Sequence, residues 1–400
     1  MATGSKNGCA VLPVDLNKLS AIKQGVDIGN WRSMPHSAWA FRNVETLIPT
    51  AKIERGAPRP VSGQSNPLNG FGVTLQSGRR LDLETFEQAT SSDAIVAFVG
   101  DELVFESYRN GVTADSRHIL MSTSKSITGL IAGILHHRGQ MDVEKPVADY
   151  VGEVVDTAYA GATIRNLLDM RTGIVLDEVQ ERRYANASNW DPLSPDEDSI
   201  EFLEFIKRLP PSPMPHGGPF KYVSANTDLL GVAIERAAGT SFAEVVSEVL
   251  WKPLGAQHDA LITLMRGGTP RATGGFCMTT RDFARVGCLL LSNGRLGDNQ
   301  IVPHEWLDDV LQNGDPSAWS EGEFGQSFAA FGKMSYRSGW YVFERDPKTF
   351  FAMGIHGQNL FIDPARNFVL AKFSSQPNPI EQVGLTHLGV AEIRRCLIGS

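Results

Sequence analysis

The sequence lacks the usual marks of membrane, secreted and zinc proteins. It has four cysteines without a Cys-x-x-Cys pair, and nine histidines without a His-Glu-x-x-His motif. Neither a disulfide framework nor a zinc site is therefore indicated. No run approaches the roughly 18 apolar residues of a membrane span, and the first residues lack the apolar core of a secretory signal. We therefore expect a cytoplasmic protein.

An excess of positive charge is also absent. Lys and Arg number 37 against 45 Asp and Glu, so the formal net charge is −8. Such a chain has no general electrostatic attraction to nucleic acid or to anionic membrane surfaces, and we expect neither as a partner. With 42% hydrophobic and 20% charged residues over 400 positions, the chain can bury a large core, in two to three domains or one composite fold.

The hydrophobic pattern predicts strands on either side of a helical segment. Residues 1–90 are irregular and are interpreted as an arm that begins an α/β domain, and a β-hairpin is predicted over 94–108. Helical spacing dominates 122–299, whereas strand patterns return between 339 and 373 before a final helix over 381–397. We expect residues 91–121 and 300–400 to form one α/β domain, 122–299 a mainly helical domain, and the active site to lie at their interface.

A Ser-x-x-Lys pattern supplies the first candidate for chemistry. It occurs as Ser20-Ala-Ile-Lys23 and as Ser122-Thr-Ser-Lys125, and only the second stands where a strand pair ends and a buried helix begins. Residues three apart on a helix share one face. A serine hydroxyl becomes a nucleophile when a nearby base takes its proton, and a buried lysine can serve. The motif alone is equally compatible with a helix-capping serine beside a solvated lysine.

Two further segments decide between these interpretations. One is Tyr222-Val-Ser-Ala-Asn-Thr-Asp228, a polar stretch opening a helix, and the other is Met353-Gly-Ile-His-Gly-Gln358, glycine-flanked within a strand run. With Ser122-Thr-Ser-Lys125, they make the chain resemble the serine β-lactamase and penicillin-binding-protein superfamily. Within it, the similarity is to class C β-lactamases, family VIII carboxylesterases and above all 6-aminohexanoate-dimer (nylon oligomer) hydrolases. Trp31-x3-Pro-His-x2-Trp-Ala-Phe41 and Gly354-Ile-His-Gly-Gln-Asn-Leu360 carry the last comparison.

The resemblance implies a β-lactamase/transpeptidase-like fold of the α/β plus all-α class, with an antiparallel sheet flanked by helices and a helical insertion domain. It implies Ser122 as nucleophile, Lys125 as its proton-managing partner and Tyr222 as general base and acid, a lysine ammonium beside the phenol favouring phenolate. The backbone N–H groups of Ser122 and Ile355 would form the oxyanion hole. No metal and no organic cofactor is needed. Further residues expected to bind substrate are Ser224, Gln180, Thr273, Gly354 and His356.

Departures from the superfamily pattern narrow the expected activity. The Lys-Thr-Gly triad that helps to hold β-lactam carboxylates is missing, and Ala352-Met-Gly354 takes its place. We therefore expect weak or absent β-lactamase activity and hydrolysis of small carboxylic esters or linear amides through an acyl-enzyme. In the nylon-oligomer branch a tyrosine holds the substrate amide where this chain has Gln180. The alternatives are an acyltransferase of the same fold and a non-catalytic binding or scaffold protein. A homodimer is possible.

Overall fold

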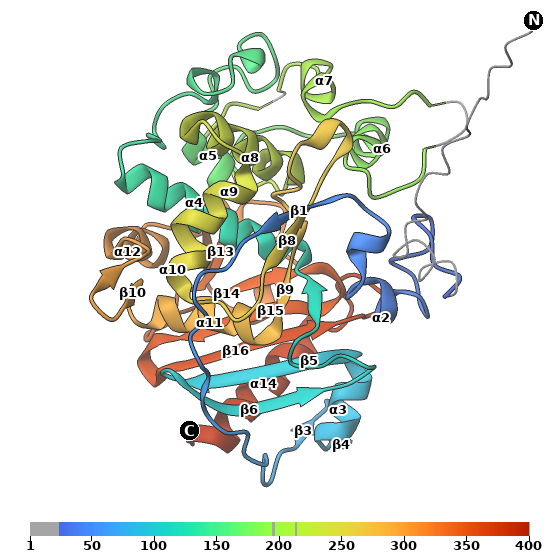
Figure 1. Cartoon of the computed structure of the whole chain (residues 1–400), viewed down its shortest axis with the longest axis vertical. Helices are drawn as coiled ribbons and strands as arrows, with labels where there is room; N and C mark the ends of the chain where they lie inside the picture. Colours follow the sequence, from blue (N-terminus) through green and yellow to red (C-terminus); the bar gives the residue numbers. More distant parts are fainter. Residues whose placement is uncertain (1–23, 194–196, 213, 400) are drawn as a thin grey trace, which may run out of the picture.

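A computed structural model describes residues 24–193, 197–212 and 214–399. Its main element is an eight-stranded sheet with the strand order β12-β13-β14-β15-β16-β5-β6-β2. Figure 1 shows the strands from β13 to β6 in this order. Neighbouring strands are antiparallel except β2 and β6, which are parallel. The expected hairpin is present as β5 and β6. The strands are β2 (Ser62–Gly63), β5 (Ser92–Val99), β6 (Glu102–Tyr108), β12 (Met334–Arg337), β13 (Trp340–Phe343), β14 (Thr349–Gly354), β15 (Gln358–Asp363) and β16 (Phe368–Ser374).

Helices cover both faces of this sheet, because the central strands direct buried apolar side chains to both faces in alternation. On β5, Val96 and Phe98 belong to the core that contains helix α11 (Thr280–Leu291), whereas Ile95 and Ala97 belong to the core that contains α3 (Leu83–Ala89) and α14 (Val383–Ile398). Successive side chains of a strand point to opposite faces, so one short apolar run serves two cores. The predicted terminal helix is confirmed as α14.

The helical segment surrounds α4 (Ser124–His137), in which every residue from Ser124 to Leu135 is buried. A helix that is buried on all sides must be enclosed by other elements, and α4 contacts α8 and β13. Helices in this segment and beyond it are α2 (Ser37–Ala40), α5 (Ile164–Leu168), α6 (Glu178–Ala187), α7 (Phe202–Lys207), α8 (Ser224–Ala238), α9 (Phe242–Val246), α10 (Lys252–Leu254), α12 (His304–Gln312) and α13 (Pro316–Ser320).

A second sheet differs from the sequence expectation. Its order is β1-β8-β9-β7, formed by β1 (Thr50–Ile53), β7 (Arg117–Ile119), β8 (Ala260–Thr263) and β9 (Phe276–Thr279). Two of these strands lie within 122–299, so that segment is less purely helical than expected, and β1 pairs the N-terminal arm with β8. Runs of four buried residues carry too little periodicity to distinguish a strand from a helical turn. The remaining strands form two small ribbons, β3 (Val73–Thr74) with β4 (Arg80–Leu81) and β10 (Arg295–Leu296) with β11 (Asn299–Gln300).

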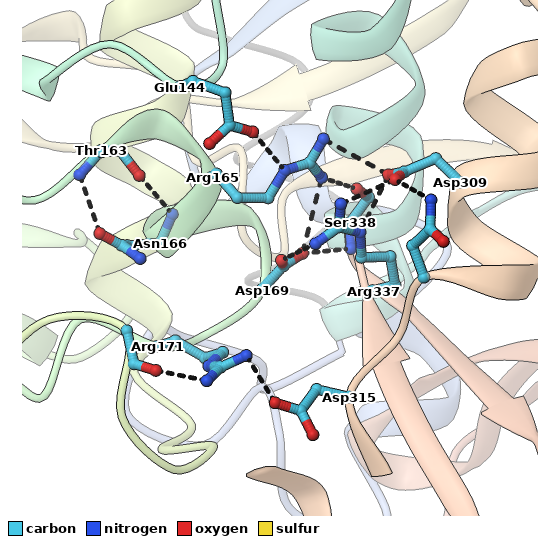
Figure 2. Close-up of polar contacts among 12 residues, drawn as sticks. Glu144, Thr163, Arg165, Asn166, Asp169, Arg171, Asp309, Asp315, Arg337 and Ser338 are labelled. Atoms are coloured by element: carbon cyan, nitrogen blue, oxygen red, sulfur yellow. Dashed lines mark hydrogen bonds and ion pairs between the residues drawn. The ribbon is translucent and has the colours of Figure 1, made fainter. Parts of the chain in front are cut away.

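An ion-pair cluster around the buried Asp169 joins the helical segment to the sheet (Figure 2). Asp169, just after α5, accepts hydrogen bonds from the Ser338 N–H at 2.9 Å and from Arg337 Nη1 at 2.6 Å. Arg337 also binds Asp309 of α12 through Nε at 2.9 Å and Nη2 at 2.7 Å. The same β12–β13 turn reaches α4, because Ser126 Oγ donates to the Gly339 carbonyl at 2.6 Å. The cluster therefore holds the helical segment against the sheet directly beside the start of α4.

Two findings concern the whole of the described chain. Across residues 24–193, 197–212 and 214–399, none of the helices combines the length and the apolar character needed to cross a lipid bilayer. Over the same residues, His, Cys, Asp and Glu side chains do not gather in groups of three or more that could ligate a metal ion. The alternative Ser20–Lys23 motif lies outside the described residues.

Candidate active site

Ser122 stands at a strand-to-helix junction. Strand β7 ends at Ile119, a 3₁₀ turn spans Met121–Thr123, and α4 begins at Ser124. Met121 immediately before the serine has φ +48°, a backbone region that is unfavourable for a residue with a side chain. The turn keeps Ser122 half-buried at the edge of a pocket, whereas its neighbours Met121 and Thr123 are fully buried.

Lys125 directs its amine at this serine. The side chain comes from the first turn of α4 and is 3% exposed. Its Nζ lies 3.1 Å from Ser122 Oγ and 3.1 Å from the Thr273 carbonyl oxygen. Burial lowers the pKa of Lys125 well below its usual value; nearby Asp228 opposes this shift and Arg271 adds to it. An amine shifted toward its neutral form can accept the serine proton.

Tyr222 completes the group from the loop before α8. The Lys125 Nζ lies 4.7 Å from the centre of its ring, and the ring of Phe324 stacks on it with centroids 5.4 Å apart. Its backbone N–H donates to Glu323 Oε2 at 3.0 Å. Burial raises the pKa of Tyr222, and a side-chain hydrogen bond with Ser122 opposes that shift. The hydroxyl, amine and phenol predicted from two distant stretches of sequence therefore meet in one place.

The directions of the two pKa shifts differ from the one expected from the sequence. A lysine ammonium beside the phenol was expected to favour phenolate, yet burial lowers the pKa of Lys125 and raises that of Tyr222. Burial disfavours the charged form of each group. The arrangement is therefore suited to a neutral amine as base and a neutral phenol as proton donor.

A buried network behind Lys125 was not found from the sequence. Asp228 of α8 accepts a hydrogen bond from the Thr273 N–H at 2.9 Å and one from the Tyr184 hydroxyl at 2.6 Å, and it pairs with Arg271. The Arg271 guanidinium lies 4.8 Å from the ring centres of both Tyr184 and Trp190. Because the Thr273 carbonyl contacts Lys125, this network fixes one of the two polar partners of the amine. Asp228 is the last residue of the Tyr222–Asp228 motif. Its place in that motif is the sequence signal from which its part in the site could have been predicted.

Gly354 places the end of β14 against the serine. A Cβ at this position would lie 2.8 Å from the Leu120 carbonyl oxygen and 2.9 Å from the Ser122 nitrogen. These are backbone atoms that cannot easily move, so the close approach requires glycine. Ile355 follows directly and lines the same pocket as Ser122. The two backbone N–H groups predicted for the oxyanion hole thus belong to segments in contact.

The other predicted substrate-binding side chains do not line this pocket. Thr273 contributes its carbonyl to Lys125, while Gln180 caps α6 by accepting from the Asp177 N–H at 2.8 Å. Ser224 is the half-buried first residue of α8. The His356 ring is within 2.7 Å of the Gln376 carbonyl through Nδ1 and packs edge-on against Phe41. The structure brings Gly354 to the pocket in front of Ser122, and it does not bring these four side chains there.

That pocket extends from Ser122 and Tyr222 across strands β13, β14 and β15 of the main sheet. It holds about 500 Å³ of space between protein atoms, part of it open to solvent, and Tyr222, Phe324 and Tyr341 of β13 lie around it. Its full lining is Ser122, Tyr222, Phe324, Tyr341, Met353, Gly354, Ile355, Gly357, Asn359, Gln376, Pro379, Ile380, Val383 and Thr386.

An antiparallel sheet, a helical insertion and a Ser-x-x-Lys turn between them define the class of β-lactamase-fold serine hydrolases. Comparison with known proteins gives the same class. A model of the Beta-lactamase family matches residues 76–394. The 6-aminohexanoate-dimer hydrolase of Paenarthrobacter ureafaciens is 34% identical over 362 residues, or 88% of each chain. The chain belongs to the beta-lactamase family and is a hydrolase, which confirms the resemblance inferred from its motifs.

Solved structures agree on the fold. A Bacillus anthracis protein assigned as a 6-aminohexanoate-dimer hydrolase has a TM-score of 0.85 and 26% identity, and the match covers 93% of this chain and 97% of that one. EstCE1, a hydrolase with promiscuous acyltransferase activity, has a TM-score of 0.59 at 15% identity, with 79% and 98% covered. The second likeness is one of fold alone. The β-lactamase/transpeptidase-like fold predicted from the sequence is therefore confirmed.

Proposed function

We propose that the chain hydrolyses small carboxylic esters and linear amides through an acyl-enzyme on Ser122. The observation that carries the proposal is the 3.1 Å separation of Lys125 Nζ from Ser122 Oγ, with the amine buried. A neutral amine at this distance is within reach of the serine proton. Linear amides belong in the proposal because the relative from Paenarthrobacter ureafaciens is a 6-aminohexanoate-dimer hydrolase.

In the acylation step, Ser122 Oγ forms a bond to the carbonyl carbon and its proton passes to Lys125 Nζ. The carbonyl oxygen becomes an oxyanion, which the backbone N–H groups of Ser122 and Ile355 stabilise. The bond to the leaving oxygen or nitrogen then breaks, and the Tyr222 hydroxyl supplies the proton that the leaving atom needs. The Lys125 ammonium returns a proton to Tyr222, so both groups end in their starting forms.

Deacylation repeats the same chemistry with water. Lys125 accepts a proton from water as the water oxygen bonds to the acyl carbon, and the bond from that carbon to Ser122 Oγ breaks. The Lys125 ammonium returns this proton to the serine oxygen, and the carboxylic acid leaves. Each step conserves protons within the three side chains, the substrate and water.

The test compares Ser122→Ala, Lys125→Ala and Tyr222→Phe with the wild type. Substrates are a p-nitrophenyl ester, a linear aminohexanoate amide and a chromogenic cephalosporin. We expect Ser122→Ala to lower kcat by about 10⁴-fold or more and Tyr222→Phe to lower it by about 10²–10⁴-fold. Ser320→Ala, at an exposed position at the end of α13, is the matched control. A fluorophosphonate probe should add its mass to the wild type and not to Ser122→Ala.

Full turnover by Ser122→Ala would overturn the mechanism. A marked preference for the cephalosporin would contradict the argument from the missing Lys-Thr-Gly triad.

A cytoplasmic location is also part of this proposal. It is supported by Cys277, Cys288 and Cys396, which carry free thiols within the described chain, because disulfides predominate in oxidising compartments.

A further inference from the structure

We propose that Glu323 is a positioning residue for Tyr222, and that it thereby determines whether the enzyme cleaves bonds whose leaving atom needs a proton. Alkyl esters and linear amides have such leaving groups, whereas p-nitrophenyl esters do not. The inference rests on the proposed function, because that function makes Tyr222 the proton donor. Glu323 does not line the pocket, so it acts through the loop that carries Tyr222.

The loop that carries Tyr222 has no regular structure of its own. Residues 220–223 lie outside any helix or strand, and α8 begins after them without a side-chain cap. A backbone N–H in such a loop needs a partner from another segment. The Tyr222 N–H donates to the Glu323 carboxylate at 3.0 Å, and hydrogen bonds to a charged acceptor are stronger than those between neutral groups. A side chain from a distant part of the sequence therefore holds the backbone of the proton donor.

The backbone of Glu323 is itself fixed against the same loop. Its N–H donates to the Phe220 carbonyl at 3.0 Å, and the Phe220 N–H donates to the Ala318 carbonyl at 2.9 Å. A Cβ on the neighbouring Gly322 would lie 2.5 Å from the Phe220 carbonyl oxygen, so the two segments approach more closely than a side chain would allow. Glu323 thus reaches Tyr222 from a backbone whose place the loop already defines.

The carboxylate and the next residue act on different ends of Tyr222. Glu323 Oε1 pairs with Lys221 Nζ at 3.3 Å, while Oε2 accepts the Tyr222 N–H. The ring of Phe324 stacks on the Tyr222 ring with an interplanar angle of 30°. Stacking restricts the plane of the phenol, and the hydrogen bond restricts the position of its backbone. Two consecutive residues therefore orient the group that must reach the leaving atom.

An ion pair joins the two segments at their other end. Asp315, at the start of α13, binds Arg171 at 3.0 Å (Figure 2). Arg171 Nε also donates to the Gly218 carbonyl at 2.7 Å, four residues before Tyr222. The loop and the segment after α13 therefore remain connected without Glu323. We expect loss of its carboxylate to displace Tyr222 locally and to leave the two segments together.

A displaced phenol affects substrates unequally. Proton transfer from a positioned acid contributes about 10²–10⁴-fold to rate, and a displacement of about 1 Å can cost about 10²-fold. An alkoxide or an amide nitrogen needs that proton in order to leave, whereas p-nitrophenolate leaves as a stable anion. The ratio between the two kinds of substrate therefore reports on the position of Tyr222. A general loss of folded enzyme lowers both rates equally and does not change the ratio.

The experiment uses the p-nitrophenyl ester, the ethyl ester and the N-propyl amide of butyric acid, which share one acyl group. Glu323→Met removes the hydrogen-bond acceptor, and Glu323→Gln retains an acceptor without the charge. Glu321→Met is the matched control, because Glu321 is an exposed glutamate at the end of α13. Tyr222→Phe shows the full effect of losing the proton donor on the same three substrates.

For Glu323→Met we expect kcat on the ethyl ester and the amide to fall by about 10–100-fold with KM unchanged. On the p-nitrophenyl ester, kcat/KM should fall by no more than about threefold, because its leaving group needs no proton. Glu323→Gln should recover most of the loss, and Glu321→Met should behave as the wild type. The Glu323 side chain is 36% exposed, and ion pairs at the surface contribute little to stability, so urea unfolding should give nearly the wild-type midpoint.

The outcomes separate the two proposals. If Tyr222→Phe lowers the ratio of ethyl to p-nitrophenyl ester hydrolysis and Glu323→Met does not, the positioning role is wrong and the mechanism stands. An equal fall on all three substrates in Glu323→Met would also overturn the positioning role. If Tyr222→Phe leaves the ratio unchanged, or Ser122→Ala still hydrolyses the esters, the proposed function itself is wrong.

Discussion

Replacing the two charges behind Lys125 should move the pH dependence of hydrolysis in opposite directions. Asp228 raises the pKa of Lys125 and Arg271 lowers it. If the neutral amine is the base, kcat/KM rises with pH through the Lys125 pKa. Asp228→Asn removes the negative charge, lowers that pKa and moves the acid limb to lower pH. Arg271→Met removes the positive charge and moves the limb to higher pH.

The size of the effect follows from the connections in the network. Asp228 and Lys125 are linked through a single residue, Thr273, whose N–H binds one and whose carbonyl contacts the other. A unit charge about 7 Å away at an effective dielectric constant of about 20 interacts by about 2 kcal/mol. We therefore expect each acid limb to move by about one to two pH units.

The free energy of unfolding provides a second measurement on the same variants. Asp228 is fully buried and Arg271 is 6% exposed, so Asp228→Asn leaves a buried cation unpaired and should cost about 3–5 kcal/mol of unfolding free energy. The double variant Asp228→Asn/Arg271→Met removes both charges, and it should recover much of that loss and return the acid limb toward the wild-type position. Urea unfolding and kcat/KM between pH 4 and 10 measure the two effects. Limbs that move in the same direction, or do not move, would refute the electrostatic reasoning.

Three further predictions follow from individual contacts. Gly354→Ala places a Cβ against the Leu120 carbonyl oxygen and the Ser122 nitrogen, so it should lower kcat at least 100-fold in steady-state assays, whereas Gly152→Ala, with open space around its Cβ, should not. Asp169→Ala removes the buried carboxylate that joins the helical segment to the β12–β13 turn and should cost about 3 kcal/mol or more in urea unfolding. Glu144→Ala, which removes an exposed carboxylate 3.5 Å from Arg165, should cost about 1 kcal/mol or less. Because burial raises the pKa of Tyr222 above its usual value of 10, an active phenol predicts no alkaline loss of wild-type kcat/KM below pH 10; a fall near pH 8 would contradict that role.

The sequence predicts elements whose signal is local. Helix α4 follows from apolar residues at helical spacing, and Ser122 and Lys125 face one another because three residues make almost one helical turn. Hairpin β5–β6 follows from two apolar runs around a short turn. The family motifs added Tyr222 and Gly354, which no periodicity would have selected.

The remaining features depend on contacts between distant segments. Arg271 and Tyr184 meet Asp228 only after α6, α8 and the loop before β9 have packed together. His356 and Gln180 stand within or near recognisable motifs, yet hydrogen bonds with Gln376 and Asp177 occupy their side chains. Residue types do not show whether a polar side chain binds another part of the protein or a ligand, because both use the same polar atoms.

The pairing of β5 with β16 has a consequence for synthesis. These strands are adjacent at the centre of the main sheet, with Ala97 opposite Leu370, although most of the polypeptide separates them. An emerging chain must therefore expose the apolar β5–β6 hairpin until its last quarter leaves the ribosome. Long-range pairing of this kind slows folding and lengthens the time during which strand edges can aggregate. Expression at low temperature or with added chaperones should consequently raise the yield of folded protein.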